Sequence, residues 1–502
     1  MKRHRAWPSI IQVCFLTTGL ISGYFLSADQ AMAEQTAARP PVLLFKWGSL
    51  CSLFDFRGGL GTLQGCVDPD DGGPLQLGDG QFQQPGGLTL DSQGNVYVMD
   101  MRNHRIQKFD RNGRFLTKWG SFCDINDEFR RGTPTGCVDP DGGGPLQLGD
   151  GQFLLNFLGG AGIATDSSNN VYVVDQGNNR IQVFDSNGNF LRKWGSKCPF
   201  RAEPCDGFYG PRGMAIDGND FVYVYDGGRA FSDGSDPIID RVQKFDANGT
   251  RVLKFQFCGP YTGLTCNTPN FITSLNGWAL ATDANNNVYV LQQFPSVVKF
   301  DSNGNRKGLF SLNPPPFPRI TTGDAIAVDS LGQVYVRGLQ SGSGVVRVLK
   351  DTGQFTPQLL FQFAQGSGPG DLQGNGGIAL HPHSENVYLS DNTYLPQANA
   401  FFPEIKVWGA TPQNAVAFLI DRVNDLVDAG TLNKGQGNAL IAKLEAALQQ
   451  LDQGNPNTAI NQLQAFIIQL NGLINAGILT QAEGQPLIDA ANSVIEALNA
   501  GP

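Results

Sequence analysis

Short runs of alternating apolar residues, each centred on a tyrosine, recur six times along the chain. They are Asn95–Val98, Asn170–Val173, Phe221–Val224, Asn287–Val290, Gln333–Val336 and Asn386–Leu389. Successive tyrosines are separated by 75, 51, 66, 46 and 53 residues, so a constant unit is joined by connections of variable length. This combination is typical of a protein built from one repeated module.

Each unit contains four short apolar runs separated by turn residues. In the first unit a small-residue run at Gly87–Asp91 precedes the tyrosine run, a third run at Arg105–Asp110 and a fourth at Phe115–Trp119. Asn-Gly and related pairs between apolar runs are hairpin signals. Four antiparallel strands repeated six times predict a mainly β protein, a six-bladed propeller.

The fourth-strand pattern also indicates how the ring closes. It occurs first at Leu43–Trp47, before any tyrosine run, whereas the last unit ends at Ile405–Trp408 without a copy of its own. We therefore expect the N-terminal strand to be the outer strand of the last blade. Such closure removes the exposed edge that an open ring would leave.

These motifs resemble the NHL repeat over about residues 42–408. The resemblance is carried by Gly78–Phe82, Pro85–Leu88, Gly94–Val98, Asp100, Asn103, Arg105–Gln107 and Asp175–Gln182. It is weaker in blades four to six, where Gln292 and Arg337 replace the aspartate that ends the second strand. The family implies an NHL-type propeller. Some of its relatives, amidating lyases and streptogramin lyases, are enzymes that use histidines and a metal.

Residues 413–500 change to Ala, Leu, Ile and Gln at helical spacing. Apolar positions repeat at an offset of 47 residues, as in Ile420/Ile467 and Gly437/Gly484, which predicts two helical hairpins and a four-helix module. The segment resembles the FIMAH-type domain found at the C-terminus of diverse secreted bacterial proteins. That resemblance implies attachment or interaction more than chemistry.

The N-terminal residues 1–33 have the form of a Sec-type signal peptide. Basic residues precede an apolar run at Ile10–Leu26, and Ala31–Ala33 supplies the small residues of a cleavage site. The alternative is an uncleaved anchor. No later segment reaches the roughly 20 apolar residues that span a bilayer, so we expect a mature chain that is secreted or periplasmic and has no transmembrane helix.

Cysteine spacing fits an exported protein. Apart from Cys14 in the signal segment, the cysteines form four close pairs, and we expect four local disulfides: Cys51–Cys66, Cys123–Cys137, Cys198–Cys205 and Cys258–Cys266. The competing interpretation is zinc, but the pairs lack the C-x2-C spacing and nearby histidines of structural zinc sites. The mature chain keeps 33 basic and 44 acidic residues, and an acidic surface argues against nucleic-acid partners.

Two near-duplicate acidic loops, Cys66–Phe82 and Cys137–Phe153, are the candidate metal sites. Ca²⁺ takes about 6 to 8 oxygen ligands, and each loop offers three aspartates: Asp68, Asp70 and Asp79 in the first, and Asp139, Asp141 and Asp150 in the second. The alternative is that these aspartates form turns beside prolines and glycines.

Other candidate chemistry is sparse. Asp100, Asp175 and Asp226 each precede an arginine, Arg105, Arg180 and Arg241 respectively, and recurrence in successive blades favours a structural ion pair over a catalytic one. The mature chain has three histidines, and the blade pattern puts His381 and His383 in a turn on the face opposite His104, which excludes a three-histidine site.

The sequence therefore predicts no catalytic residues. It predicts an exported, non-enzymatic binding protein that uses the loop-rich, disulfide-stapled propeller face to hold a protein or a glycan, with no certain cofactor. The alternative is a lyase or lactonase-like propeller with a carboxylate-bound metal near the central channel.

Overall fold

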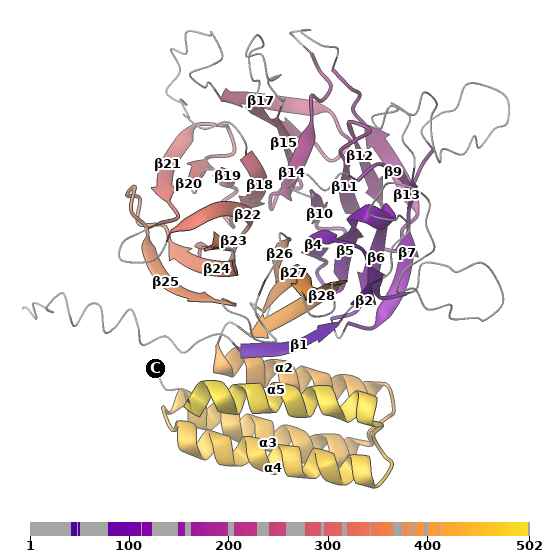
Figure 1. Cartoon of the computed structure of the whole chain (residues 1–502), viewed down its shortest axis with the longest axis vertical. Coiled ribbons are helices and arrows are strands. Elements are labelled where there is room, and N and C mark those ends of the chain that lie inside the picture. The colour runs from indigo at the N-terminus through magenta and orange to yellow at the C-terminus, as the bar shows by residue number, and fades with distance from the viewer. Residues whose placement is uncertain are drawn as a thin grey trace, which may run out of the picture.

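The computed structural model consists of a ring of β-sheets with a layer of helices against one edge of the ring (Figure 1). It describes residues 42–47, 49–50, 79–111, 113–122, 149–155, 162–198, 205–227, 240–257, 277–292, 296–313, 319–341, 343–364, 372, 376–382, 386–395, 400–409 and 411–499. The predicted signal peptide, residues 1–33, lies outside these ranges.

The described residues form six four-stranded antiparallel sheets, which are the blades of the propeller. The first three blades are β4 (Pro85–Leu90), β5 (Val96–Asp100), β6 (Arg105–Phe109) and β7 (Phe115–Trp119); β10 (Ile163–Thr165), β11 (Val171–Asp175), β12 (Arg180–Phe184) and β13 (Phe190–Trp194); and β14 (Pro211–Ile216), β15 (Val222–Gly227), β16 (Asp240–Phe245) and β17 (Arg251–Phe257).

The last three blades are β18 (Gly277–Thr282), β19 (Val288–Gln292), β20 (Ser296–Phe300) and β21 (Arg306–Ser311); β22 (Ile320–Val328), β23 (Gln333–Gln340), β24 (Ser343–Lys350) and β25 (Gln358–Phe363); and β26 (Ile378–Leu380), β27 (Val387–Leu395), β28 (Ala400–Gly409) and β1 (Val42–Trp47). Two short parallel pairs join β2 (Ser49–Leu50) to β3 (Gln81–Phe82) and β8 (Ser121–Phe122) to β9 (Gln152–Phe153). The predicted six-bladed, mainly β fold is confirmed.

The sixth blade combines strands from opposite parts of the chain. β1 pairs antiparallel with β28, where Lys46 lies opposite Lys406 and Trp47 opposite Ile405. The Lys46 ammonium also lies 2.7 Å from the Glu404 carboxylate. β1 is thus the outer strand of a sheet whose other strands come from residues 378–409.

Antiparallel order gives the ring two different faces. The loop face carries the connections from the second to the third strand of each blade and from each blade to the next. The turn face carries the tight turns, and these are alike from blade to blade. In blade one the amide of Asn95 donates to Asp91 Oδ1 (2.9 Å) and the Tyr97 hydroxyl donates to Asp91 Oδ2 (3.0 Å).

The same tyrosine–aspartate bond closes the first turn in the next three blades. It joins Tyr172 to Asp166, Tyr223 to Asp217 and Tyr289 to Asp283, at 3.1, 2.9 and 3.1 Å. The tyrosines of these three blades are themselves buried between sheets. The recurring tyrosine therefore has two structural roles: its ring packs between the sheets, and its hydroxyl donates to the aspartate of the turn.

The C-terminal residues form four helices, as predicted: α2 (Pro412–Asp428), α3 (Lys434–Asp452), α4 (Pro456–Asn475) and α5 (Gln481–Asn499). Thr411 and Asn433 cap α2 and α3 by accepting backbone N–H bonds. The 47-residue repeat has a packing reason. A Cβ on Gly437 would lie 2.2 Å from Val427, and a Cβ on Gly484 would lie 2.5 Å from Ile474, so each hairpin needs glycine at this crossing.

The helical module shares its core with the propeller. One apolar cluster runs from Leu44 of β1 and Ile405 of β28 to Val416 of α2 and Leu498 of α5. Arg111, in a turn-face loop of blade one, also pairs with Asp425 of α2 at 2.5 Å. The helical module therefore has no core separate from that of the propeller, because α2 and α5 cover the strands that close the ring (Figure 1).

No helix within the described ranges is both long enough and apolar enough to cross a membrane.

Candidate functional site: the loop face

Contacts between blades confirm which connections share the loop face. His104, in the connection from β5 to β6, accepts a 3.1 Å hydrogen bond from the amide of Leu155, which lies between blades one and two. The amide of Arg102 in the same connection donates to the Gln83 carbonyl before β4. The connections on this face therefore contact one another next to the ends of the strands that they join.

A buried ion pair between Asp100 and Arg105, together with Gln107, holds these strand ends in blade one, and we call this set of side chains the brace. Asp100 ends β5, and its carboxylate lies 2.8 Å from Nε of Arg105, which begins β6. The same carboxylate accepts bonds from the amide of Gln83 (2.7 Å) and from the side chain of Asn103 (2.8 Å). Burial raises the pKa of Asp100, and the charge of Arg105 together with these donors acts against that rise.

The brace also fixes the incoming connection. Arg105 Nη2 and Gln107 Nε2 both donate to the carbonyl of Gln81, each at 2.7 Å, and the Gln107 side-chain oxygen accepts from the amide of Gly80 at 3.0 Å. One Asp–Arg–Gln set thus satisfies the backbone where the blade-to-blade connection enters β4. Removing any member would leave buried polar groups unpaired.

Blades two and three repeat this arrangement. Asp175 pairs with Arg180 at 2.7 Å and Asp226 pairs with Arg241 at 2.8 Å. Gln182 and Gln243 reach the Gln152 and Gly207 carbonyls, as Gln107 reaches Gln81. The prediction of structural ion pairs is confirmed. Each pair is buried, and the arginine of each pair also donates to a backbone carbonyl in the connection that enters the blade.

The later blades replace the brace, and the register corrects one assignment. Gln292 takes the aspartate position in blade four and pairs with Ser296 through a 2.8 Å side-chain bond. In blade five the tyrosine register places Gly338 opposite Val345, where blade one has Asp100 opposite Arg105. Arg337 therefore precedes the aspartate position by one residue, and the expectation that it replaces the aspartate is wrong.

Arg337 instead joins blades five and six. It is fully buried, donates to the Ser390 carbonyl and lies 3.1 Å from the Asp391 carboxylate. Lys406 holds the other oxygen of Asp391 at 2.8 Å. Asp391 follows Tyr388 by three residues, as Asp100 follows Tyr97, so blade six keeps the aspartate but takes its cations from β23 and β28.

Asp324 is a candidate residue that the sequence reasoning missed. It lies at a register shift in β22, one of the innermost strands that surround the centre of the ring (Figure 1). Burial raises the pKa of its carboxyl to about 6, although the nearby Arg337 charge lowers it. Its Oδ2 is buried without a hydrogen-bond partner among the described residues.

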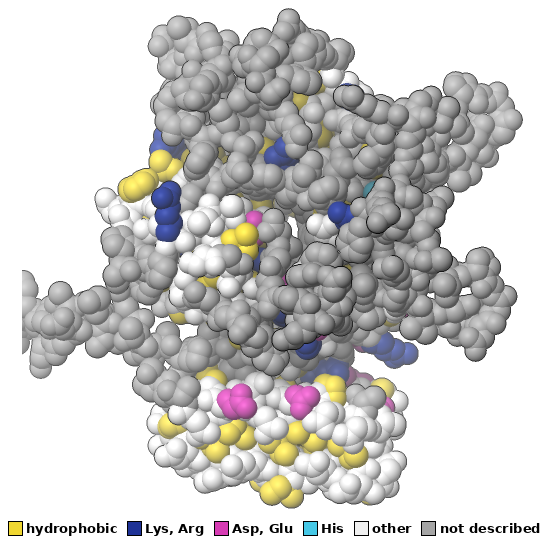
Figure 2. All heavy atoms as spheres, in the orientation of Figure 1, with side chains coloured by type: hydrophobic (Ala, Val, Ile, Leu, Met, Phe, Trp, Pro, Cys, Tyr) yellow, Lys and Arg dark blue, Asp and Glu magenta, His cyan; other side chains and the backbone are white. Residues whose placement is uncertain are grey.

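A positional signal could have found this residue. Asp324 lies three residues before Ala327, which faces the tyrosine of its blade, and the same position holds Gly86, Arg212 and Gly376 in blades one, three and six. The innermost strands thus carry different side chains at one shared position. Figure 2 shows acidic and basic side chains near the middle of the ring, among atoms that are not described.

The predicted calcium ligands fall mostly outside the described ranges. Asp68, Asp70, Asp139 and Asp141 lie outside them. Asp79 and Asp150 are described and half-exposed, and each lies near a lysine ammonium, Lys118 at 2.8 Å and Lys193 at 2.7 Å. Among the residues that the structure places, no three acidic, histidine or cysteine side chains gather as a metal site.

The histidines and cysteines are placed in part. Burial lowers the pKa of His104 to about 3, helped by the charge of Arg102, so this ring stays neutral. His381 lies in a turn on the other face and stacks near Tyr388, and His383 is outside the described residues. Cys198 and Cys205 form a disulfide. The other predicted pairs, Cys51–Cys66, Cys123–Cys137 and Cys258–Cys266, lie outside the described ranges.

Comparisons with known families agree with this architecture. Residues 82–109 and 161–184 match the NHL repeat, and residues 416–496 match the FIMAH domain. The six-bladed propeller thus contains NHL repeats in its first two blades, and the C-terminal helices match a FIMAH domain.

Two similar proteins share only part of this chain. Protein brain tumor of Drosophila melanogaster is 30% identical over 141 residues, which is 24% of this chain and 13% of that protein. The B-box type zinc finger protein ncl-1 of Caenorhabditis elegans is 30% identical over 138 residues, 24% of this chain and 16% of that protein. The chain spans less than a fifth of the length of either relative.

Among solved structures, similar folds include a streptogramin B lyase, at 12% identity and a TM-score of 0.36 over 64% of this chain and 93% of that one. A gluconolactonase from Xanthomonas campestris is 12% identical, with a TM-score of 0.40 over 74% of this chain and 97% of that one.

Proposed function

We propose that this chain is an exported binding protein whose loop face holds a protein or a glycan. The observation that carries the proposal is the repeated Asp–Arg–Gln brace beneath the loops of blades one to three. Its charged groups hold backbone and are buried, so they anchor variable connections on a rigid base. Scaffolds that bind through loops are organised in this way.

Two further features support this proposal. The Cys198–Cys205 disulfide lies in the connection from blade two to blade three, and disulfides are typical of exported proteins. The helical module packs against the closing strands and pairs with the turn-face residue Arg111, on the face of blade one opposite its Asp100–Arg105 brace. We therefore assign binding to the loop face and fastening of the ring to the helical edge.

The test begins with the mature chain, labelled and applied to printed arrays of glycans and purified proteins. A variant in which a short Gly-Asn turn replaces residues 228–239, between β15 and β16, should lose at least about tenfold in affinity for the bound partner. The brace Asp226–Arg241 stays intact in this variant, so its melting temperature should be nearly unchanged.

Two matched substitutions control for nonspecific effects. Ser196→Arg adds a large cation at an exposed site on the loop face, whereas Ser168→Arg adds the same group at an exposed turn-face site. We expect the first to weaken binding and the second to leave it unchanged. Equal binding by the loop variant and the intact chain would overturn the proposal, as would the absence of any bound glycan or protein.

The alternative function is that of a metal-dependent lyase or lactonase. One observation favours it: burial raises the pKa of the Asp324 carboxyl, which lies beside the centre of the ring. Native mass spectrometry of the mature chain separates the two classes. A tightly held transition metal that is lost in Asp324→Asn would favour the enzyme over the binding protein.

A further inference from the structure

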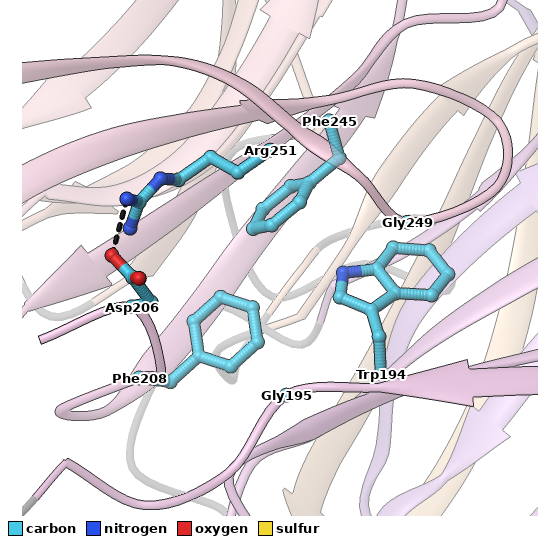
Figure 3. Close-up of a pocket in the computed structure, with 7 residues that line it drawn as sticks. All are labelled: Trp194, Gly195, Asp206, Phe208, Phe245, Gly249 and Arg251. Atoms are coloured by element: carbon cyan, nitrogen blue, oxygen red, sulfur yellow. Dashed lines mark hydrogen bonds and ion pairs between the residues drawn. The ribbon is translucent and has the colours of Figure 1, made fainter.

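Ile468, near the middle of α4, is a large apolar side chain that the fold leaves 72% exposed. The seam between blades two and three shows the opposite arrangement, because Phe208 and Phe245 are only 1% and 3% exposed. Figure 3 shows their rings close together, with the Asp206–Arg251 ion pair beside them. A partner cannot reach those rings, whereas Ile468 is open to contact.

α4 lies in the layer of the helical module that is farther from the propeller. α2 and α5 contact β1 and β28, and α3 and α4 lie on the other side of the module (Figure 1). The buried residues of α4 form its inner face: Ala459, Ile460, Leu463, Phe466, Leu470 and Leu473. Ile468 belongs to the outer face, which points away from the core.

The outer face of α4 has a regular pattern. Exposed residues recur at alternating spacings of four and three: Asn457, Asn461, Gln464, Ile468, Asn471 and Asn475. This is the heptad spacing at which residues of one helix meet a second helix. α4 also contains no charged residue, whereas α2, α3 and α5 contain four, four and three. A surface helix normally carries charges on its solvent side, so α4 is unusual in this module.

An uncharged face suits contact with a second copy of the same chain. Across a two-fold axis each surface meets itself, so a face that carries one sign of charge repels its copy. Amide side chains both donate and accept hydrogen bonds, so the Asn and Gln residues of α4 can pair with those of another copy. α4 can therefore lie against its own copy without like-charge repulsion.

The internal repeat of the helical module relates this face to an interface. An offset of 47 residues places Ile468 and Gly472 at the positions of Asp421 and Asp425 in α2. Both acids of α2 lie near the Arg111 guanidinium of the propeller, Asp425 at 2.5 Å and Asp421 at 3.9 Å. The helix face that contacts the propeller in α2 is thus exposed in α4, where an apolar residue and a glycine replace the two acids.

Gly472 is not required by the packing of its own chain. A Cβ added there would meet no neighbouring atom within 4 Å, in contrast to Gly437 and Gly484, where a Cβ would overlap a side chain. Glycine inside a helix lowers helix stability, so its place one turn after Ile468 indicates another role. A second helix can approach closely where no Cβ projects.

We propose that two copies of this chain pair through the outer faces of α4 across a two-fold axis. Ile468 and Gly472 lie at the centre of the contact, and the Asn and Gln side chains on either side pair through their amides. One helix pair about 30 Å long is smaller than the roughly 1,200–2,000 Å² of standard interfaces, so we expect a dissociation constant on the order of 10 μM. The pairing does not depend on the loop-face function.

The test is sedimentation velocity of the mature chain over a range of concentrations. We expect a monomer when the chain is dilute and a species of twice the monomer mass when it is concentrated. If the chain stays monomeric up to about 200 μM, well above the expected dissociation constant, the proposal is overturned.

Charge variants connect the dimer to α4. Ile468→Glu puts two like charges across the axis and should weaken dimerisation at least about tenfold. Asn492→Glu adds the same charge at an exposed position of α5 and should leave dimerisation unchanged. An equimolar mixture of Ile468→Glu and Ile468→Lys should recover the dimer, because opposite charges then meet. A dimer that Ile468→Glu leaves intact, or a mixture that stays monomeric, would overturn the assignment.

Gly472→Gln separates the contact between copies from helix stability. Glutamine is a better helix former than glycine, so the dilute variant should melt at the same temperature as the intact chain or higher. Its side chain should nevertheless hold the two helices apart and weaken dimerisation several-fold. Dimerisation as tight as that of the intact chain would show that the glycine lies outside the contact and would overturn the proposed centre.

Discussion

The two faces of the propeller use aspartate in opposite ways. On the turn face, Asp91, Asp166, Asp217 and Asp283 accept bonds from nearby amides and from a tyrosine hydroxyl, at the same spacing in each blade. On the loop face, Asp100, Asp175 and Asp226 are buried against arginine, and blades four and five depart from this pattern.

The turn-face aspartates form the same hydrogen bonds in blades one to four, whereas the loop-face ion pair occurs only in blades one to three among the described residues of blades one to five. A turn-face aspartate takes its hydrogen bonds from its own hairpin, so it can recur without depending on the length of the connections between blades. A loop-face aspartate must fit the connection that enters its blade, and those connections differ in length. Uniform turns and variable braces therefore indicate that the loop face is where the blades became different from one another.

The largest expected effect comes from breaking a loop-face brace. Asp226→Ala should cost about 3–5 kcal/mol of unfolding free energy, since it leaves the buried Arg241 without a counterion. Gln292→Ala, at the same position of blade four, removes a neutral bond to Ser296 and should cost about 1 kcal/mol. Denaturant unfolding of both variants measures the contrast. Equal losses would show that the ionic brace has no special role.

The next largest effect should be the pH dependence of stability, which should have opposite signs for Asp324 and for a turn-face aspartate. The folded chain keeps the Asp324 proton up to a pKa of about 6, whereas an unfolded aspartate releases it near 3.8. The folded state therefore loses stability as pH rises from about 4 to about 6, by at most about 3 kcal/mol. Asp324→Asn should be more stable than the intact chain at pH 8 and equal to it at pH 4.

A turn-face aspartate should behave with the opposite sign. Burial acts to raise the pKa of Asp283, but bonds from Asn287 and Tyr289 and the charge of Lys299 bring it below the usual 3.8. Its stabilisation is present above pH 3.8 and is lost as pH falls further. Asp283→Asn should thus be less stable than the intact chain at pH 7. Melting curves between pH 3 and 8 would contradict this comparison if both variants shifted in the same direction.

The smallest effect should come from a single turn bond. Tyr97→Phe removes the hydroxyl that donates to Asp91 and keeps the buried ring, so it should cost about 1 kcal/mol. Tyr289→Phe is the matched change in blade four and should cost the same, because turns do not depend on the brace of their blade. A clearly larger loss in blade one would link the two faces energetically.

Much of the fold could be read from the sequence because its signals are local. The tyrosine runs, the Asn-Gly turns and the 47-residue helical repeat each describe contacts close in the chain. The register of Arg337 could not be read, because a one-residue shift across a hairpin depends on strand pairing. The contact of Leu44 with the helices could not be read either, since an apolar strand residue does not indicate which partner covers it.

The candidate site was less predictable for the same reason. The Asp100–Arg105 pair can be predicted because the two residues lie five positions apart and the same two residue types recur at Asp175 and Arg180. Asp324 stands out only once the bulge in β22 and the charge on Arg337 are known. The replacement of Phe190 in blade two by Arg251 in blade three could not be read either, because the two residues are equivalent only through strand register.

Hydrogen–deuterium exchange of the mature chain, with and without the partner selected on the arrays, tests most directly whether the loop face is the working surface. We predict slower exchange on the loop face, in peptides covering residues 101–104, 149–155 and 205–210, and no change in the turns at 91–95 and 166–170. Protection confined to the turns, or to the helices at 412–499, would contradict the claim that the loop face is the working surface.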